Sequence, residues 1–82
     1  MSIIIALKLN NRMNTSDKVQ NILSLYGCYI NFRIGFHDTS NNKCTNYGII
    51  LLEFTNDKNI YNNFIMELSS IDNLEVKTIK FT

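Results

Sequence analysis

Two successive segments of the sequence each predict a strand, a helix and a second strand, and this repeated order constrains the fold more than any other feature. The predicted strands are rich in isoleucine and phenylalanine or alternate between apolar and polar side chains, and the predicted helices repeat apolar residues every three or four positions. No proline interrupts these segments. In chain order, the predicted elements are strand, helix, strand, strand, helix and strand, at residues 3–9, 15–27, 30–37, 47–54, 56–71 and 74–81.

This order predicts one particular α+β architecture. Right-handed crossover connections place both helices on the same face of a four-stranded antiparallel sheet, which is the ferredoxin-like βαββαβ sandwich. The chain has 82 residues and no linker or low-complexity tract, so residues 1–82 are expected to form a single domain. In this fold the first and third strands lie at the centre of the sheet.

The ends of the helices and the core follow from local signals. Thr15 or Ser16 is expected to cap the first helix, and Gly27 to end it. The pair Asn56-Asp57 is expected to cap the second helix. The apolar positions predict a core between the sheet and the helices that includes Leu23, Phe32 and Phe64.

The face of the sheet away from the helices is expected to be apolar at its centre. In the second strand, strict alternation directs residues such as Phe32 and Ile34 towards the helices and leaves Asn31 and Arg33 on the open face. In the central strands, however, the outward positions are also apolar. Because exposed apolar patches usually mark interfaces, we predict an oligomer interface with Lys8 and Glu53 at its rim, formed by Ile4, Ala6, Ile49 and Leu51.

Composition excludes several classes of protein. The formal net charge is only +1 and no basic stripe is present, so direct nucleic-acid binding is not expected. No apolar stretch approaches the length of a membrane span, and Ile3 to Leu7 is too short for the apolar region of a signal peptide. The two cysteines, Cys28 and Cys44, form no C-x-x-C pair. We therefore expect a cytoplasmic protein with reduced thiols.

Catalytic or metal-binding chemistry has one candidate location. His37, Asp38 and Cys44 lie within eight residues of one another, and this set defines the alternative hypothesis of a small metal-binding protein or enzyme. Their spacing matches no zinc motif, and neither a nucleophile–base–orienting set nor a glycine-rich phosphate loop is present. Hence neither an enzyme nor a cofactor is expected. The polar segment 38–46 predicts a mobile or partner-binding loop.

Four short segments resemble the ACT-like family of iron-only hydrogenase system regulators, and the resemblance covers nearly the whole chain. The opening strand at 3–9 and the helical segment Val19–Leu23 are similar to that family. Phe32–Phe36 resembles its Arg-x-Gly strand, and Ile71–Thr78 resembles its closing strand. His37 stands where the family commonly has proline, and Asn73 replaces the glycine of the last turn.

The resemblance implies a non-enzymatic regulatory or ligand-sensing domain that assembles through its sheet. It implies a homo-oligomer, a dimer or tetramer, that acts through a protein partner or an unidentified small ligand. The ligand-binding candidates lie in the first strand–helix loop and in the Arg-x-Gly strand: Asn11, Arg12, Arg33, Gly35 and His37.

Overall fold

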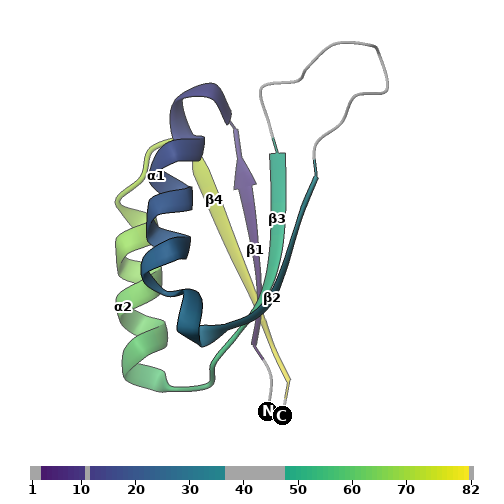
Figure 1. The fold of residues 1–82 in the computed structure, drawn as a ribbon, viewed down its shortest axis with the longest axis vertical. Helices are drawn as coiled ribbons and strands as arrows, with labels where there is room; N and C mark the ends of the chain where they lie inside the picture. Colours follow the sequence, from purple (N-terminus) through teal and green to yellow (C-terminus); the bar gives the residue numbers. More distant parts are fainter. Residues whose placement is uncertain (1–2, 11, 37–47, 82) are drawn as a thin grey trace.

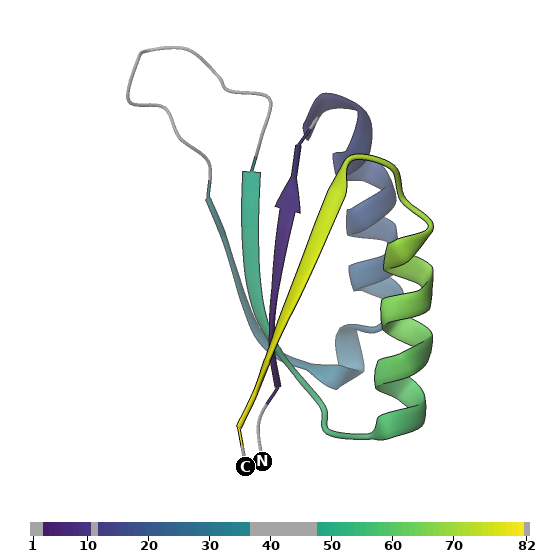
Figure 2. The ribbon, with the colours of Figure 1, turned by 180° about the vertical axis from the view of Figure 1, so that it is seen from behind.

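The computed structural model describes residues 3–10, 12–36 and 48–81, and it has the predicted ferredoxin-like architecture (Figure 1). The sheet order is β2-β3-β1-β4, and each neighbouring pair is antiparallel. Both helices cover one face of the sheet, and the other face is open (Figure 2). The elements are β1 (Ile3–Leu9), α1 (Arg12–Leu25), a short 3₁₀ helix (Gly27–Tyr29), β2 (Ile30–Phe36), β3 (Gly48–Phe54), α2 (Lys58–Ser69) and β4 (Leu74–Lys80).

The core lies between the sheet and the two helices. Alternate residues of β1 and β3 are buried, as the period of two in a strand requires. Leu23 of α1 and Phe64 of α2 are fully buried against them, which confirms two of the three predicted core positions. The ring of Phe64 stacks on that of Phe54, with centroids 4.3 Å apart. This stacked pair anchors α2 to the central strand β3.

The predicted cap of the first helix is wrong. Helix α1 already begins at Arg12, so Thr15 lies inside the helix and is 2% exposed. Gly27 begins the short 3₁₀ helix and does not adopt the left-handed conformation of a typical C-terminal glycine. The cap of α2 is confirmed, because an Asp57 carboxylate oxygen accepts hydrogen bonds from the backbone N–H groups of Asn59 and Ile60, at 3.0 and 3.2 Å.

A β-bulge in β2 reverses the predicted faces of that strand. Ile30 pairs with Phe54, but Phe32 pairs with the next residue of β3, Glu53, so Asn31 is an additional residue without a counterpart. Beyond Asn31 every side chain of β2 therefore changes sides relative to strict alternation. Phe32, which we predicted to be buried, is 44% exposed.

The last turn adopts the conformation expected from its sequence. Asn73 has a φ of 64°, in the left-handed region that asparagine tolerates better than most residues. Its carbonyl oxygen accepts a hydrogen bond from the backbone N–H of Asn10, at 2.8 Å. This bond joins the turn before β4 to the end of β1.

A pair of polar side chains joins the residue that follows α1 to helix α2. The hydroxyl of Tyr26 donates a hydrogen bond to the carboxylate of Glu67 in α2. This hydrogen bond is the main reason that the pKa of Tyr26 is raised above 10.0, with desolvation and the charge of Glu67 as further causes. The ring of Tyr26 also packs on Phe64, with centroids 5.0 Å apart, so one side chain contacts both α2 and the core.

Neither helix has the length and hydropathy needed to cross a membrane in the part of the chain that the structure describes. The predicted loop at 38–46 lies outside the described residues.

Candidate functional site

The open face of the sheet is the first candidate site, and its residues form cross-strand rows. The β2 end of these rows is apolar, because the bulge places Phe32 and Ile34 there. The four predicted interface residues Ile4, Ala6, Ile49 and Leu51 are all half-buried. From β2 to β4, three rows of this face are complete in the register. The first is Phe32, Glu53, Ile4 and Ile79, the second is Ile34, Leu51, Ala6 and Lys77, and the third is Phe36, Ile49, Lys8 and Glu75.

The most exposed apolar side chains of this face lie on the two edge strands. Ile34 of β2 is 56% exposed and Ile79 of β4 is 54% exposed. Sequence alternation identified the central residues but missed these, since it placed Ile34 in the core. Together with Phe32, the two residues extend the apolar surface across the width of the sheet. The "open face" below means the face formed by Ile4, Ala6, Phe32, Ile34, Ile49, Leu51, Glu53 and Ile79, with Lys8, Glu75 and Lys77 towards β4.

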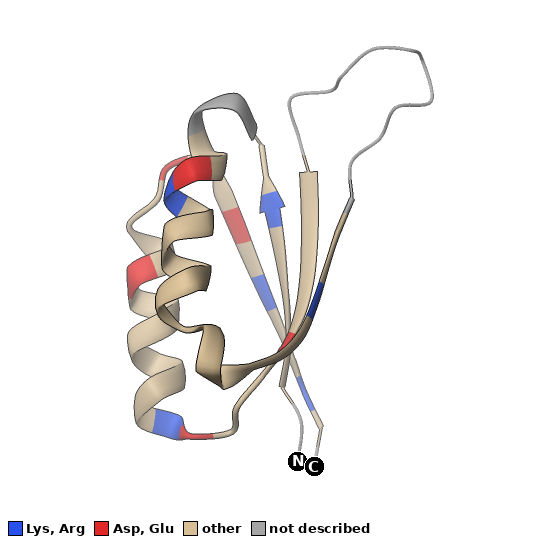
Figure 3. Ribbon diagram, in the orientation of Figure 1, with Lys and Arg blue, Asp and Glu red and all other residues tan. Residues whose placement is uncertain are grey.

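Charged side chains of both signs are interspersed over the molecule (Figure 3). On the open face, Lys8 lies beside Glu75 in the pairing of β1 with β4, and Lys77 lies one row away. Glu53 lies nearer the apolar end, where its carboxylate accepts a hydrogen bond from the Asn31 side chain at 3.1 Å. The open face therefore has two acidic and two basic residues, with no excess of either sign.

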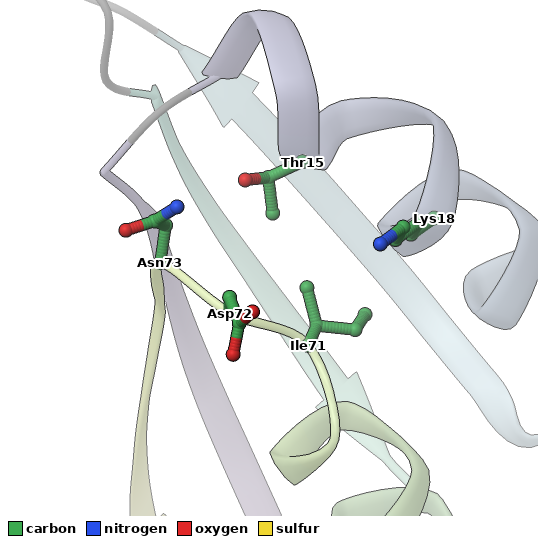
Figure 4. Close-up of a pocket in the computed structure, with 5 residues that line it drawn as sticks. All are labelled: Thr15, Lys18, Ile71, Asp72 and Asn73. Carbon is green, nitrogen blue, oxygen red and sulfur yellow. The ribbon is translucent and has the colours of Figure 1, made fainter.

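A small hollow between α1 and the turn before β4 is the second candidate site (Figure 4). Its volume is about 170 Å³, and its lining combines side chains from both ends of the chain. Helix α1 contributes two polar residues, and the α2–β4 turn contributes an acid and an amide. The lining residues are Thr15, Lys18, Ile71, Asp72 and Asn73.

Thr15 gives this hollow an unusual electrostatic feature. Its side chain is almost fully buried, yet its hydroxyl forms no hydrogen bond within the part of the chain that the structure describes. Native proteins pair nearly all buried polar groups, because an unpaired one carries a desolvation penalty. Lys18 and Asp72, both exposed, add a positive and a negative charge to the rim. The hollow can therefore bind a small polar molecule through a hydroxyl, an ammonium, a carboxylate and an amide.

Those predicted ligand-binding residues that the structure describes do not form one cluster. Asn11 and His37 lie outside the described residues, and Arg12 is the first residue of α1. Arg33 lies on the helix-facing side of edge strand β2, where it donates a hydrogen bond to the Gln20 side chain at 2.6 Å.

Gly35 lies on the helix-facing side of β2, as Arg33 does, and a larger residue would fit at this position without a close contact. A Cβ added at Gly35 would meet only the side chain of Ile50, at a normal distance of 3.8 Å. Since β2 and β4 are opposite edges of the sheet, Arg33 and Gly35 are remote from the turn of the hollow. The prediction thus pointed to the strand–helix junction but missed Asp72 and Asn73, which the sequence identified only as a turn.

Within the described ranges, no three His, Cys, Asp or Glu side chains are placed so that they could hold a metal ion. Cys28 is exposed and is a free thiol. The alternative set His37, Asp38 and Cys44 lies outside the described residues.

Comparison with solved structures finds the same fold in distant proteins. The chain is similar to the uncharacterized protein TM1266 from Thermotoga maritima, with a TM-score of 0.85 and 21% identity over 99% of this chain and 96% of that one. It is also similar to part of a formyltetrahydrofolate deformylase from Pseudomonas putida KT2440, with a TM-score of 0.59 and 14% identity over 99% of this chain but 29% of that one. No protein-family model matches the sequence, and no curated protein matches it. These likenesses show a shared fold.

Proposed function

We propose that this chain is a non-enzymatic, ACT-like regulatory module that senses a small polar ligand in the hollow and acts as a homo-oligomer. The observation that carries the proposal is the buried Thr15 hydroxyl, which lines the hollow without a hydrogen-bond partner among the described residues. A ligand that bonds to this hydroxyl would remove its desolvation penalty. The hollow is therefore better suited to being filled than to remaining empty.

The chemistry of the lining defines the class of ligand. Lys18 can pair with a carboxylate, and Asp72 can pair with an ammonium group. Thr15 and Asn73 can donate or accept hydrogen bonds. A small molecule that carries both charges, of which a free α-amino acid is the simplest, uses all four groups.

The position of the hollow supports sensing. Its lining comes from α1 and from the turn that precedes β4, two segments that lie far apart in the sequence. The backbone bond between Asn10 and Asn73 joins the same turn to the end of β1, two residues before α1 begins. A bound ligand would strengthen this junction, and stabilisation of one conformation by a ligand is how a binding module transmits a signal.

The finer proposal is that the module regulates an iron-only hydrogenase system through a protein partner. The resemblance of Phe32–Phe36 and Ile71–Thr78 to that family supports it. Deletion of the gene in its native host should change hydrogenase activity or the abundance of the mature enzyme. Unchanged hydrogenase activity and abundance would contradict this finer proposal. Ligand sensing is tested separately, by the titration described next.

Ligand sensing is tested by titration of isotope-labelled protein with each standard α-amino acid, followed by amide chemical shifts. At least one amino acid should produce saturable shifts that centre on Thr15, Lys18 and Asp72. Lys18→Gln should weaken that binding by about tenfold, the loss expected from about 1.4 kcal/mol of charge-assisted bonding. The matched control is Lys58→Gln, which removes an exposed lysine at the start of α2 and should leave binding unchanged. The proposal would be contradicted if no amino acid produced saturable shifts.

A further inference from the structure

We infer that Thr15 and Ile71 determine which amino acid the hollow accepts, and that they select a short side chain that ends in a hydroxyl, as in serine. The inference rests on the proposed function, because it specifies the ligand of the same hollow. It concerns the side chain of the ligand, whereas the proposed function concerns the two charges that every α-amino acid carries.

The residues that line the hollow lie at different depths. Lys18, Asp72 and Asn73 are exposed, whereas Thr15 is 2% exposed and Ile71 is 8% exposed. In Figure 4 the Ile71 side chain extends from the turn towards the part of α1 that carries Thr15 and Lys18. The hollow therefore has a charged rim and an inner wall that combines one hydroxyl with one branched apolar side chain.

This difference in depth determines how an amino acid is oriented in the hollow. Its carboxylate pairs with Lys18 and its ammonium group pairs with Asp72, both at the rim. Charged groups are favoured where water still reaches them, because burial of a charge carries a large desolvation penalty. The side chain of the ligand consequently points inward, against Thr15 and Ile71.

The buried hydroxyl selects a ligand whose side chain forms hydrogen bonds. Thr15 has no hydrogen-bond partner among the described residues. An aliphatic side chain would cover this hydroxyl and leave it unpaired, whereas a hydroxyl on the ligand can donate to it or accept from it. Thr15 thereby favours serine over alanine, which differ by one hydroxyl.

The volume of the hollow limits the length of that side chain. A cavity of about 150 Å³ holds one benzene molecule. The hollow, at about 170 Å³, therefore has room for a ligand of about seven non-hydrogen atoms. Serine has this size, and threonine has an additional methyl group. Because Ile71 packs in the hydrophobic core, its position is fixed, and it favours serine over threonine.

Isothermal titration calorimetry with serine, alanine and threonine tests the inference. The wild-type protein should bind serine at least about tenfold more tightly than either of the other two. One missing hydroxyl at a site that bonds it, or one methyl group too many, changes affinity by about this factor or more. Amide chemical shifts at Thr15 and Asp72 show that the binding takes place in the hollow.

A variant of Ile71 tests the limit on size. Ile71→Val deletes one carbon atom from the inner wall, so it should reduce the preference for serine over threonine by about tenfold. The matched control is Ile50→Val, which deletes the same atom from an equally buried position of β3 that does not line the hollow. This control should leave the preference unchanged.

A variant of Thr15 tests the selection of a hydroxyl. Thr15→Val should bind serine and alanine with equal affinity, because the group that distinguishes them is no longer present. The matched control is Thr78→Val, the same change in β4 outside the hollow, which should keep the preference for serine. Circular dichroism of each variant shows whether a change in binding reflects the hollow or a loss of folding.

The outcomes separate this inference from ligand sensing. A wild-type protein that binds alanine, threonine or a larger amino acid in the hollow as tightly as serine would overturn the inference and support sensing. An unchanged preference for serine in Ile71→Val and Thr15→Val would overturn the roles of both residues. A protein that binds no amino acid would contradict the inference and the sensing proposal together.

Discussion

Replacement of Thr15 by valine should stabilise the protein, although it removes a polar group from a helix. Valine has the same shape, is also β-branched and has a similar helix propensity, so packing and backbone preferences change little. The change deletes a hydroxyl that is almost fully buried and that has no hydrogen-bond partner among the described residues. An unsatisfied buried group carries a penalty of about 1–3 kcal/mol. We therefore expect the free energy of unfolding to rise by about 1 kcal/mol in the absence of ligand.

The matched control is the same substitution at Thr78, where the hydroxyl is bonded. The Thr78 hydroxyl accepts a hydrogen bond from the Tyr61 hydroxyl at 3.0 Å. Thr78→Val leaves the partly buried Tyr61 hydroxyl without this acceptor, which should lower stability by about 0.5–1.5 kcal/mol. Urea unfolding followed by circular dichroism measures both variants. Two identical substitutions should thus have effects of opposite sign.

Thr15→Val should weaken ligand binding although it raises the free energy of unfolding. The variant should bind the amino acid found by titration more weakly than wild type, because the hydroxyl is no longer present in the hollow. A Thr15→Val protein that is destabilised by more than about 1 kcal/mol would refute the reasoning, since it would mean that the hydroxyl has a structural partner. A stabilised variant with unchanged ligand affinity would refute the role of Thr15 in binding.

Substitutions at three other positions test the fold. Phe64→Ala should lower stability by about 3–5 kcal/mol in urea unfolding, because it removes a fully buried ring that stacks on Phe54, and a loss below about 1 kcal/mol would contradict the core. The raised pKa of Tyr26 means that its bond to Glu67 stabilises the fold below pH 10.0 and is lost as the pH rises through the raised value, so Tyr26→Phe should reduce the alkaline loss of stability; parallel pH profiles would argue against this bond. Asn73→Ala should cost about 1–2 kcal/mol because of its positive φ, whereas Asn73→Gly should not; equal effects would exclude the left-handed turn.

The order of elements and most of the core could be predicted from the sequence, because both depend on periodicity. Leu23 and Phe64 each belong to a row of apolar residues at helical spacing, and both are buried. The cap at Asp57 and the turn at Asn73 follow from local signals, and the structure confirms both. Such signals depend on a few neighbouring residues and not on the rest of the fold. The start of α1 was less predictable, since the sequence offers Thr15 as a cap while the helix begins at Arg12.

The faces of β2 could not be predicted, because a bulge depends on pairing with another strand. The alternation of Ile30, Phe32 and Ile34 is regular, and nothing in the strand itself marks Asn31 as an additional residue. The shift is visible only against the register of β3. The hollow was missed for a related reason, since Thr15 and Asp72 are brought together by packing and share no sequence motif.

A native mass spectrum of protein purified under mild conditions tests assembly and ligand binding most directly, because one spectrum reports both the mass of the assembly and any retained ligand. We expect the mass of a dimer with a small molecule bound to each copy, and we expect Thr15→Val to remain a dimer but to lose that molecule. A spectrum that contains only the bare monomer would contradict both the homo-oligomeric assembly and the binding of a ligand in the hollow.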